Sequence, residues 1–171
     1  MAEQLVHTFL DLFAGLSSIP FGKELTIFFI SCLPILELRG GLIAASLLGL
    51  NPLSSFVICI IGNLLPLPFI IWFITPIFTK LKQTKLFRPL VTKLENKALS
   101  KREQVEKYEF WGLLLFVGIP LPGTGGWTGA LVASVIDMDK KKALLASTLG
   151  VFLAGGIMML LSFGLLRGII G

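Results

Sequence analysis

Long apolar stretches constrain this chain more strongly than any other feature of its sequence. The 171-residue chain is 54% apolar and 15% charged, and its mean hydropathy is +0.87. A water-soluble domain of this size would need more charge, and a helix needs roughly 20 apolar residues to cross a bilayer. We therefore expect an all-α integral membrane protein. The apolar stretches cover residues 5–21, 25–50, 53–79, 110–136 and 143–170. The first is near the lower length limit for a transmembrane helix, so it could span the membrane or lie in its interface.

Two of these stretches are interrupted near their centres by residues that break helices. Proline ends a helix, and glycine accepts the backbone angles of a tight turn, so we interpret both interruptions as turns between short helices. The first interruption contains Pro34, Glu37, Arg39, Gly40 and Gly41. The second contains Pro120, Pro122, Gly123, Thr124, Gly125, Gly126, Trp127 and Thr128.

The two halves of the chain resemble each other at an offset of 88 residues. Roughly one position in six is identical, which is little more than a leucine-rich composition would give by chance. However, the matching prolines fall at the same point of each interrupted stretch, so we predict an internal repeat. The identical pairs include Leu33 and Pro34 with Leu121 and Pro122, Gly41 with Gly129, Ala45 and Ser46 with Ala133 and Ser134, and Gly62 with Gly150.

The basic residues predict how the chain is threaded through the membrane. Of the 15 Lys and Arg residues, nine lie within residues 80–107 and three within 140–142. Because cytoplasmic loops are rich in Lys and Arg, both clusters should lie on the cytoplasmic side. The stretch 110–136 would then enter the membrane and return to that side. By the repeat, the stretch 25–50 would enter and return from the outer side, and its exit at 49–52 carries no positive charge.

The predicted fold is an inverted repeat of a re-entrant hairpin followed by a transmembrane helix, which is typical of secondary transporters. We expect a single membrane domain over residues 1–171. Its expected parts are an N-terminal helix (1–23), repeat 1 (24–79), a basic connector (80–109) and repeat 2 (110–171). The connector is predicted to be a cytoplasmic amphipathic helix or helix pair whose apolar face carries Leu81, Leu86, Leu90, Leu94 and Leu99.

Glu37 and Arg39 are the first candidates for chemistry. They are the only charged residues between Glu24 and Lys80. A charge at membrane depth costs roughly 2.5–3.5 kcal/mol on insertion scales, so such residues indicate function. Arg39 offers a planar cation that matches carboxylate or phosphate, and Glu37 could take up and release a proton. The alternative is a structural pair whose members serve each other or cap backbone groups.

The second interruption carries no charge, so its chemistry would come from backbone N–H groups and hydroxyls. Thr124 and Thr128, together with the glycine backbone, could form a nest that binds an anion. A tight turn between packed helices explains the same residues equally well. Trp127 could be an interfacial anchor or a substrate contact. Asn63 is a buried amide that either makes an interhelical hydrogen bond or contacts a ligand.

The chain lacks the sequence signatures of several classes of protein. There is no Walker loop, no Ser/His/Asp arrangement and no metal-ligand spacing. We therefore expect no enzymatic activity, no ATP-driven pump, no cofactor and no metal. A net charge of +5 could suggest nucleic acid, but the basic residues lie in loops between apolar stretches, so we expect no nucleic-acid partner.

Three segments, residues 33–41, 62–66 and 118–129, resemble the prokaryotic family of small multidrug export proteins. The similarity covers most of the chain after the N-terminal stretch. That family looks like a distant branch of the DedA (VTT-domain) superfamily, which is built on two opposed re-entrant hairpins. Members of the superfamily are implicated in moving lipids across bilayers, including undecaprenyl phosphate. Glu37 and Arg39 match its acidic first motif, whereas the second hairpin here lacks its arginines.

The resemblance implies a DedA-like transporter or lipid translocase in the prokaryotic inner membrane, moving an amphipathic anion such as undecaprenyl (polyprenyl) phosphate. Arg39 would hold the headgroup with help from N–H groups of the 123–126 turn, and Glu37 would couple the cycle to protons. The alternatives are a proton-coupled small multidrug exporter of hydrophobic cations and a non-transporting membrane scaffold. The expected partners are membrane lipids and a lipid-linked phosphate or other amphipathic small molecule. A second copy of the chain, in a homodimer, is a further possible partner.

Overall fold

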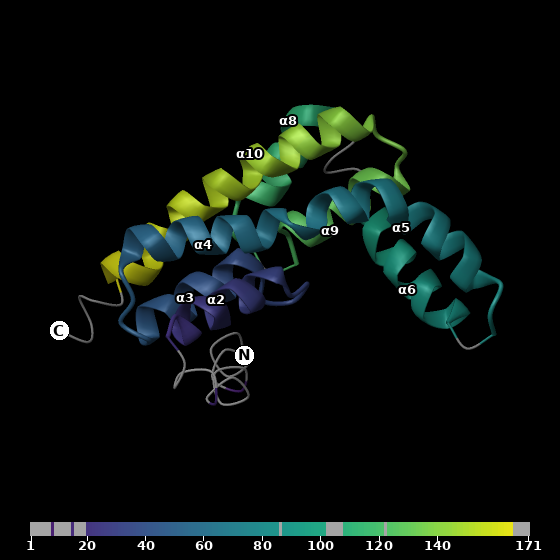
Figure 1. Cartoon of the computed structure of the whole chain (residues 1–171). Helices are drawn as coiled ribbons and strands as arrows, with labels where there is room; N and C mark the ends of the chain where they lie inside the picture. The colour runs from purple at the N-terminus through teal and green to yellow at the C-terminus, as the bar shows by residue number, and fades with distance from the viewer. Residues whose placement is uncertain are drawn as a thin grey trace. The chain divides into compact units, whose positions relative to one another are not determined.

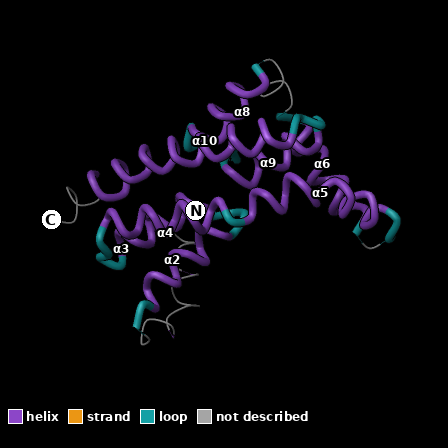
Figure 2. The backbone as a smooth tube through the Cα atoms, turned by 45° about the horizontal axis from the view of Figure 1, so that its top comes forward, coloured by secondary structure: helices purple, strands orange, loops and turns teal. Residues whose placement is uncertain are grey.

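The computed structural model describes residues 8, 15, 20–85, 87–101, 108–121 and 123–165. These residues form helices and contain no strand, which confirms the predicted all-α class (Figure 2). The N-terminal stretch 5–21, predicted as a helix, lies almost entirely outside the described residues. The chain divides into two compact units: unit 1 comprises residues 1–65 and 151–171, and unit 2 comprises residues 66–150.

Two helices are long and apolar enough to cross a membrane. They cover Pro52–Lys82, with 31 residues, and Lys140–Gly164, with 25 residues. At 1.5 Å per residue, each exceeds the roughly 30 Å thickness of a hydrocarbon core. Both lie where the sequence predicted spans, at 53–79 and 143–170. The first consists of α4 (Pro52–Leu64) and α5 (Pro66–Lys82), and the second of α10 (Lys140–Met159) followed by the π-helix η2 (Leu160–Leu165).

In unit 1, α2 (Gly22–Cys32) and α3 (Glu37–Leu47) form a helical hairpin that packs beside α4 (Figure 1). The two ends of the hairpin lie together, because the Lys23 ammonium donates a hydrogen bond to the Leu48 carbonyl (3.4 Å). Small residues allow this close packing. A side chain at Gly41 would overlap Ser31 of α2 and would lie 2.8 Å from the sulfur of Cys59 on α4.

In unit 2, α8 (Glu109–Gly118) and α9 (Gly126–Val135) form a second helical hairpin, and α9 also packs against α5 and α6 (Arg88–Leu99). The two ends of this hairpin also lie together. Glu109, at the start of α8, lines the same pocket of about 250 Å³ as Ile136 to Asp139, which follow α9. Glycine again marks the contact, since a side chain at Gly129 would overlap Val117 of α8.

Unusual backbone conformations recur at the 88-residue offset found in the sequence. Left-handed or other positive φ angles are uncommon outside glycine, so matched positions carry information. Three pairs of positive φ angles are separated by this offset: Phe21 (63°) and Glu109 (40°), Glu37 (50°) and Gly125 (134°), and Gly49 (67°) and Asp137 (57°). Each pair occupies the same place in its hairpin: at the start of its first helix, at its tip, and just after its second helix.

The turns that follow α3 and α9 also share their hydrogen bonds. In each, an N–H just after the left-handed residue bonds to a carbonyl five residues earlier, and a side chain caps the next helix. The turn bonds are Leu50 N–H to Ala45 O (3.0 Å) and Met138 N–H to Ala133 O (3.0 Å). In the caps, Asn51 Oδ1 accepts a hydrogen bond from the Ser54 N–H (3.3 Å), and Asp139 Oδ1 accepts one from the Lys142 N–H (2.9 Å). All four pairs of equivalent residues are separated by the same offset.

The connector differs in part from its predicted form. Residues 102–107 and Leu86 lie outside the described residues, and α5 continues past 79 to Lys82. The leucines predicted for the apolar face of α6 differ from its buried residues: Leu90 and Leu99 are 54% and 42% exposed and Leu94 is half-buried, whereas Val91 and Ala98 are buried. These smaller side chains let α6 approach its neighbours closely, which leaves the larger leucines on other faces of the helix.

Candidate functional site

The tip of the first hairpin is a short turn between Cys32 and Glu37. Leu33 is extended (φ −77°, ψ 139°), and the N–H of Glu37 donates to the Leu33 carbonyl (2.9 Å). Pro34 lies in the turn, where its missing N–H is no loss. Pro34 and Ile35 are both exposed, and Ile35 is 77% exposed. The turn therefore presents Pro34 and Ile35 outward, whereas the next two residues, Leu36 and Glu37, are buried.

Glu37 combines burial with an unusual backbone angle. Its side chain is 5% exposed, and its φ of 50° is left-handed. A left-handed conformation costs a residue with a Cβ roughly 1–2 kcal/mol, so it persists only where the surrounding structure enforces it. Such strain is concentrated at functional sites. At the equivalent position of the second hairpin stands Gly125, which adopts positive φ without this cost.

Arg39 lies on the first turn of α3 and interacts electrostatically with Glu37. Residues two positions apart on a regular helix do not face each other, but Glu37 at the left-handed start of α3 departs from that geometry. Arg39 is partly exposed, whereas Glu37 is buried. The first hairpin therefore holds both charges, as predicted, with the cation more accessible than the carboxylate.

Gly40 and Gly41 set the position of α3 rather than offering polar groups. A side chain at Gly40 would lie 2.6 Å from the Cβ of Leu36 and 3.3 Å from Ile30. Gly41 has the equally close neighbours described above. Both glycines are buried, so they bring the charged end of α3 against α2. The sequence indicated the glycines but not Ser31, the close neighbour of Gly41, whose hydroxyl donates to the Ile27 carbonyl (2.8 Å).

Asn63 lies near the end of α4, on the side of unit 1 that holds the hairpin tip. Its neighbour Gly62 contacts α2 closely, since the Cys32 thiol donates to the Gly62 carbonyl (3.1 Å). Asn63 is 2% exposed, and its Oδ1 has no hydrogen-bond partner among the described residues. A buried acceptor of this kind calls for an explanation, such as a ligand or a water. Contact with a ligand, one of the two interpretations of this amide, therefore stays a prediction.

The tip of the second hairpin is a turn closed by its own threonine. The Thr124 hydroxyl lies within donating distance of the carbonyls of Ile119 (2.8 Å) and Leu121 (2.9 Å) and accepts from the Leu121 N–H (3.3 Å). Pro120 ends the preceding helix, and Gly123 adopts a φ of 83°. Pro122 lies outside the described residues. The Thr124 hydroxyl thus organises the turn itself, and a role in binding an anion stays a prediction.

Gly126, Trp127 and Thr128 form the first turn of α9. Gly125 and Gly126 are buried, whereas Trp127 and Thr128 are partly exposed. N–H groups at the start of a helix favour an anion, and this N-terminal turn follows the neutral tip directly. The expected site residues accordingly fall into two groups. Unit 1 holds Pro34, Glu37, Arg39, Gly40, Gly41 and Asn63, and unit 2 holds Pro120, Gly123, Thr124, Gly125, Gly126, Trp127 and Thr128.

Comparison with known proteins identifies a family for this chain. The profile of a family described as "Putative small multi-drug export protein" matches residues 37–157, well over half of the chain. The match includes Glu37, Arg39 and all of the second hairpin. No curated protein and no solved structure matches the chain. Within the described residues, no group of three or more His, Cys, Asp and Glu side chains could hold a metal ion.

Proposed function

The chain belongs to the family of small multi-drug export proteins, and we propose that it carries an amphipathic anion across the membrane without hydrolysing ATP. The family and the two long apolar helices place the protein in a membrane. More specifically, we propose that the protein is a DedA-like lipid translocase of the prokaryotic inner membrane. Its solute would be a polyprenyl phosphate such as undecaprenyl phosphate.

The unequal exposure of Glu37 and Arg39 carries this proposal. A solute that reaches the tip of the first hairpin meets the partly exposed guanidinium before the buried carboxylate. The guanidinium is a permanent cation whose fork of N–H donors fits a phosphate or carboxylate. An anion therefore gains from this site, whereas a hydrophobic cation is repelled by it. Glu37 would then act as the group that couples transport to protons.

The lengths of the hairpin helices support entry into the membrane from one side and return to the same side. The helices α2, α3, α8 and α9 contain 11, 11, 10 and 10 residues. At 1.5 Å per residue each is about 15–17 Å long, roughly half the thickness of a 30 Å hydrocarbon core. Within each hairpin the two ends lie together, so a hairpin that enters at one surface would end near the midplane.

The recurrent backbone turns support a duplication of hairpin plus long helix, and the charges suggest that its two copies are inverted. The turn before α10 is followed by three lysines, 140–142, whereas the equivalent turn before α4, residues 49–52, has no basic residue. Cations are disfavoured at a helix N-terminus, so lysines at the start of α10 are better explained by membrane orientation than by helix stability. The lysines and the connector would lie on the cytoplasmic side.

Cysteine labelling tests this orientation. In a background in which Cys32 and Cys59 are replaced, Asn51→Cys and Lys141→Cys should react with an impermeant maleimide from opposite sides of the membrane. Both positions are exposed, so burial does not prevent labelling. Permeabilised membranes, in which both should react, provide the control. Labelling of both positions from the same side would contradict the inverted repeat.

The family's name favours a second candidate, drug export, for which hydrophobic cations would be the solutes. In that mechanism Glu37 would bind the drug and the proton in turn. The partly exposed Arg39 opposes it, because a cation approaching Glu37 would be repelled. A non-transporting scaffold is the third candidate, and full function in both Glu37→Gln and Arg39→Ala variants would favour it.

Binding to the purified protein in detergent distinguishes the first two candidates. Wild type should bind undecaprenyl phosphate in preference to a lipophilic cation such as tetraphenylphosphonium. Arg39→Gln should weaken binding of the phosphate by about tenfold or more, because a charge-assisted hydrogen bond is lost. The matched control is Lys23→Gln, which removes one positive charge from the opposite end of the same hairpin and should leave binding unchanged.

Each unfavourable result has a clear meaning. Unchanged phosphate binding in Arg39→Gln would overturn the proposed role of the arginine. Preferential binding of the lipophilic cation, lost in Glu37→Gln, would support the exporter instead.

A further inference from the structure

The outward face of α6 contains a basic groove of about 720 Å³, which we call the α6 groove. Three of its lining side chains are cations, and the lining includes no carboxylate. A site lined by three cations without a compensating acid attracts anions. The groove is lined by Lys85, Arg88, Pro89, Thr92, Lys93 and Asn96.

The packing of α6 explains why these residues share one face. Val91 and Ala98 are buried, which turns that side of the helix toward the rest of unit 2. Arg88, Thr92 and Asn96 recur every four residues and therefore lie along the other side. The nearest acid on the helix, Glu95, forms an ion pair with Lys82. Its charge is thus engaged outside the groove.

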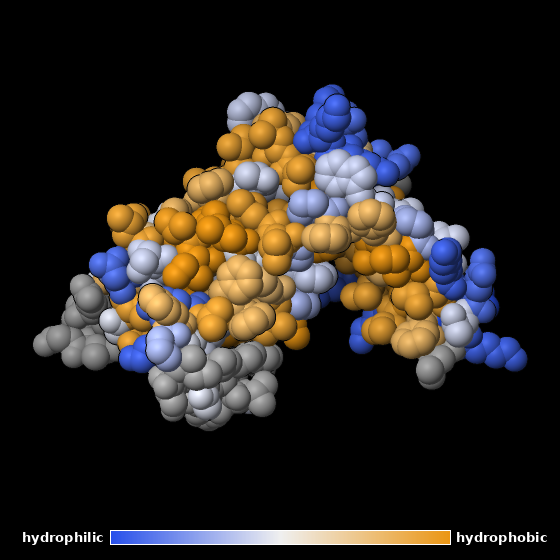
Figure 3. All heavy atoms as spheres, viewed as in Figure 1, coloured by the Kyte–Doolittle hydropathy of each residue, from blue (hydrophilic) through white to orange (hydrophobic). Residues whose placement is uncertain are grey.

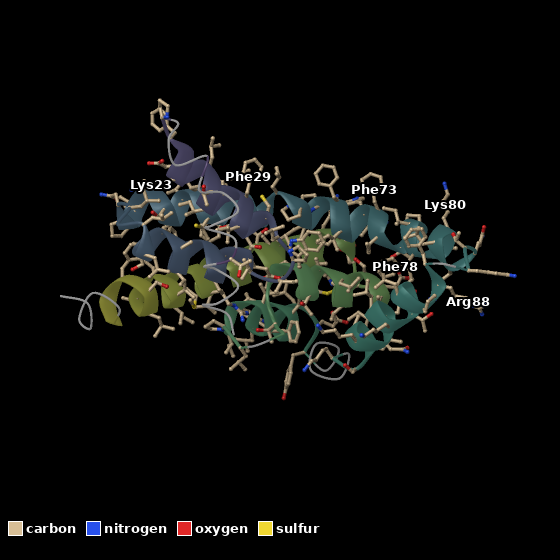
Figure 4. All side chains as sticks on the ribbon, turned by 90° about the horizontal axis from the view of Figure 1, so that it is seen from below. Lys23, Phe29, Phe73, Phe78, Lys80 and Arg88 are labelled. Carbon is tan, nitrogen blue, oxygen red and sulfur yellow. The ribbon has the colours of Figure 1, made fainter. Side chains whose placement is uncertain are left out.

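The groove follows directly in sequence after the long apolar helix. Phe78 on α5 is buried, Lys80 begins the basic connector, and Arg88 begins α6. Hydrophilic side chains gather at this end of α5 and α6 (Figure 3), and Lys80 and Arg88 extend outward from it (Figure 4). Basic residues that directly follow a membrane helix lie at the level of the lipid headgroups.

The groove also offers more than positive charge. The Asn96 amide can donate a hydrogen bond, and the Arg88 guanidinium can bind a phosphate through two parallel N–H groups. The Thr92 hydroxyl already donates to the Arg88 carbonyl (2.9 Å), so it shapes the groove rather than binding. Leu90 and Leu99 on the same helix are exposed and can contact acyl chains. The groove is wide and open, so a ligand larger than a phosphate ion can lie along it.

We propose that the α6 groove binds the headgroup of an anionic phospholipid from the surrounding bilayer. The phosphate would lie against Lys85, Arg88 and Lys93, and the acyl chains would extend toward the exposed leucines. Charge complementarity and the adjacent apolar helix favour this ligand over a soluble anion. This site is separate from Glu37 and Arg39, and its existence does not depend on the transported solute.

Lipid retention tests the proposal. The full-length protein is purified from nanodiscs containing phosphatidylcholine and phosphatidylglycerol, and the bound lipids are counted by native mass spectrometry. Wild type should retain phosphatidylglycerol selectively. In the combined variant Lys85→Gln, Arg88→Gln and Lys93→Gln, the amount of retained phosphatidylglycerol should fall at least about tenfold, since direct charge-assisted hydrogen bonds to the phosphate are lost.

The matched control removes three other positive charges of the connector that do not line the groove, at Lys80, Lys97 and Lys101. It should retain phosphatidylglycerol within about twofold of wild type, because each surface charge outside a site acts weakly. Circular dichroism and gel filtration verify folding, and Arg88→Gln alone serves as the milder variant if the triple variant misfolds.

Three results would overturn the proposal. Equal loss in the groove and control variants would show diffuse attraction without a site. Retention of phosphatidylcholine and phosphatidylglycerol in equal amounts would show no selectivity for charge. Displacement of the lipid by inorganic phosphate alone would assign the groove to a soluble anion.

Discussion

Replacing Gly62 or Gly150 with alanine should destabilise the folded protein by about 3 kcal/mol, the upper range for overpacking a close contact. The new Cβ at Gly62 would lie 2.7 Å from the carbonyl oxygen of Phe28. At Gly150 it would lie 2.8 Å from the carbonyl oxygen of Leu114 and 2.7 Å from the Cβ of Val117. These neighbours are backbone or Cβ atoms, so relief requires a shift of the whole neighbouring helix, α2 or α8.

Gly156→Ala is the matched control, because Gly156 lies on α10 with Gly150 and no neighbouring atom lies within 4 Å of its new Cβ. Alanine is favoured over glycine in a helix by up to about 1 kcal/mol, so this variant should be as stable as wild type or more stable. Unfolding in mixed micelles of increasing denaturing detergent measures the difference. Wild-type unfolding midpoints for Gly62→Ala and Gly150→Ala would refute the packing described for both units.

The second large effect is expected at Glu37. Under the proposed function, Glu37→Gln should reduce solute translocation by about a hundredfold or more, as loss of a group used in proton transfer does. The change removes one charge at almost constant volume, so the fold should persist. Glu37→Gly should also fold, because glycine adopts the left-handed φ of 50° without strain, but it should be equally inactive.

Translocation of undecaprenyl phosphate in proteoliposomes, with and without an imposed proton gradient, measures this effect. Glu24→Gln is the control, since it removes a carboxylate from the first turn of α2 at the far end of the same hairpin. It should translocate as wild type does. A Glu37→Gln protein that retains both its rate and its response to the proton gradient would exclude the coupling role of Glu37.

Local composition was sufficient to predict the helices and the turns between them. Long apolar helices cover Pro52–Lys82 and Lys140–Gly164, within or close to the predicted stretches, because in a lipid environment an apolar segment satisfies its backbone hydrogen bonds only within itself. Pro34 and Pro120 lie at the predicted turns, just beyond the ends of α2 and α8, where the missing proline N–H costs no helical hydrogen bond, whereas Pro76 lies inside α5. The 88-residue offset was already present as a weak identity, and the backbone angles sharpen it.

The tertiary structure decided what depends on helix rotation and on contacts between distant residues. Helical spacing predicted an apolar face that includes Leu90 and Leu99, but the side of α6 that is buried against the protein carries Val91 and Ala98. The left-handed angle of Glu37 is imposed by the packing around it, because glutamate has no local preference for that conformation.

The sequence by itself thus determined an all-helical membrane chain with two interrupted stretches and their charged and neutral tips. Only the tertiary structure decided which side chain at the first tip is buried, which glycines tolerate no side chain, and which cations of the connector share a groove. Composition and periodicity act within a segment, whereas burial, steric exclusion and shared faces arise when segments that are distant in sequence pack together.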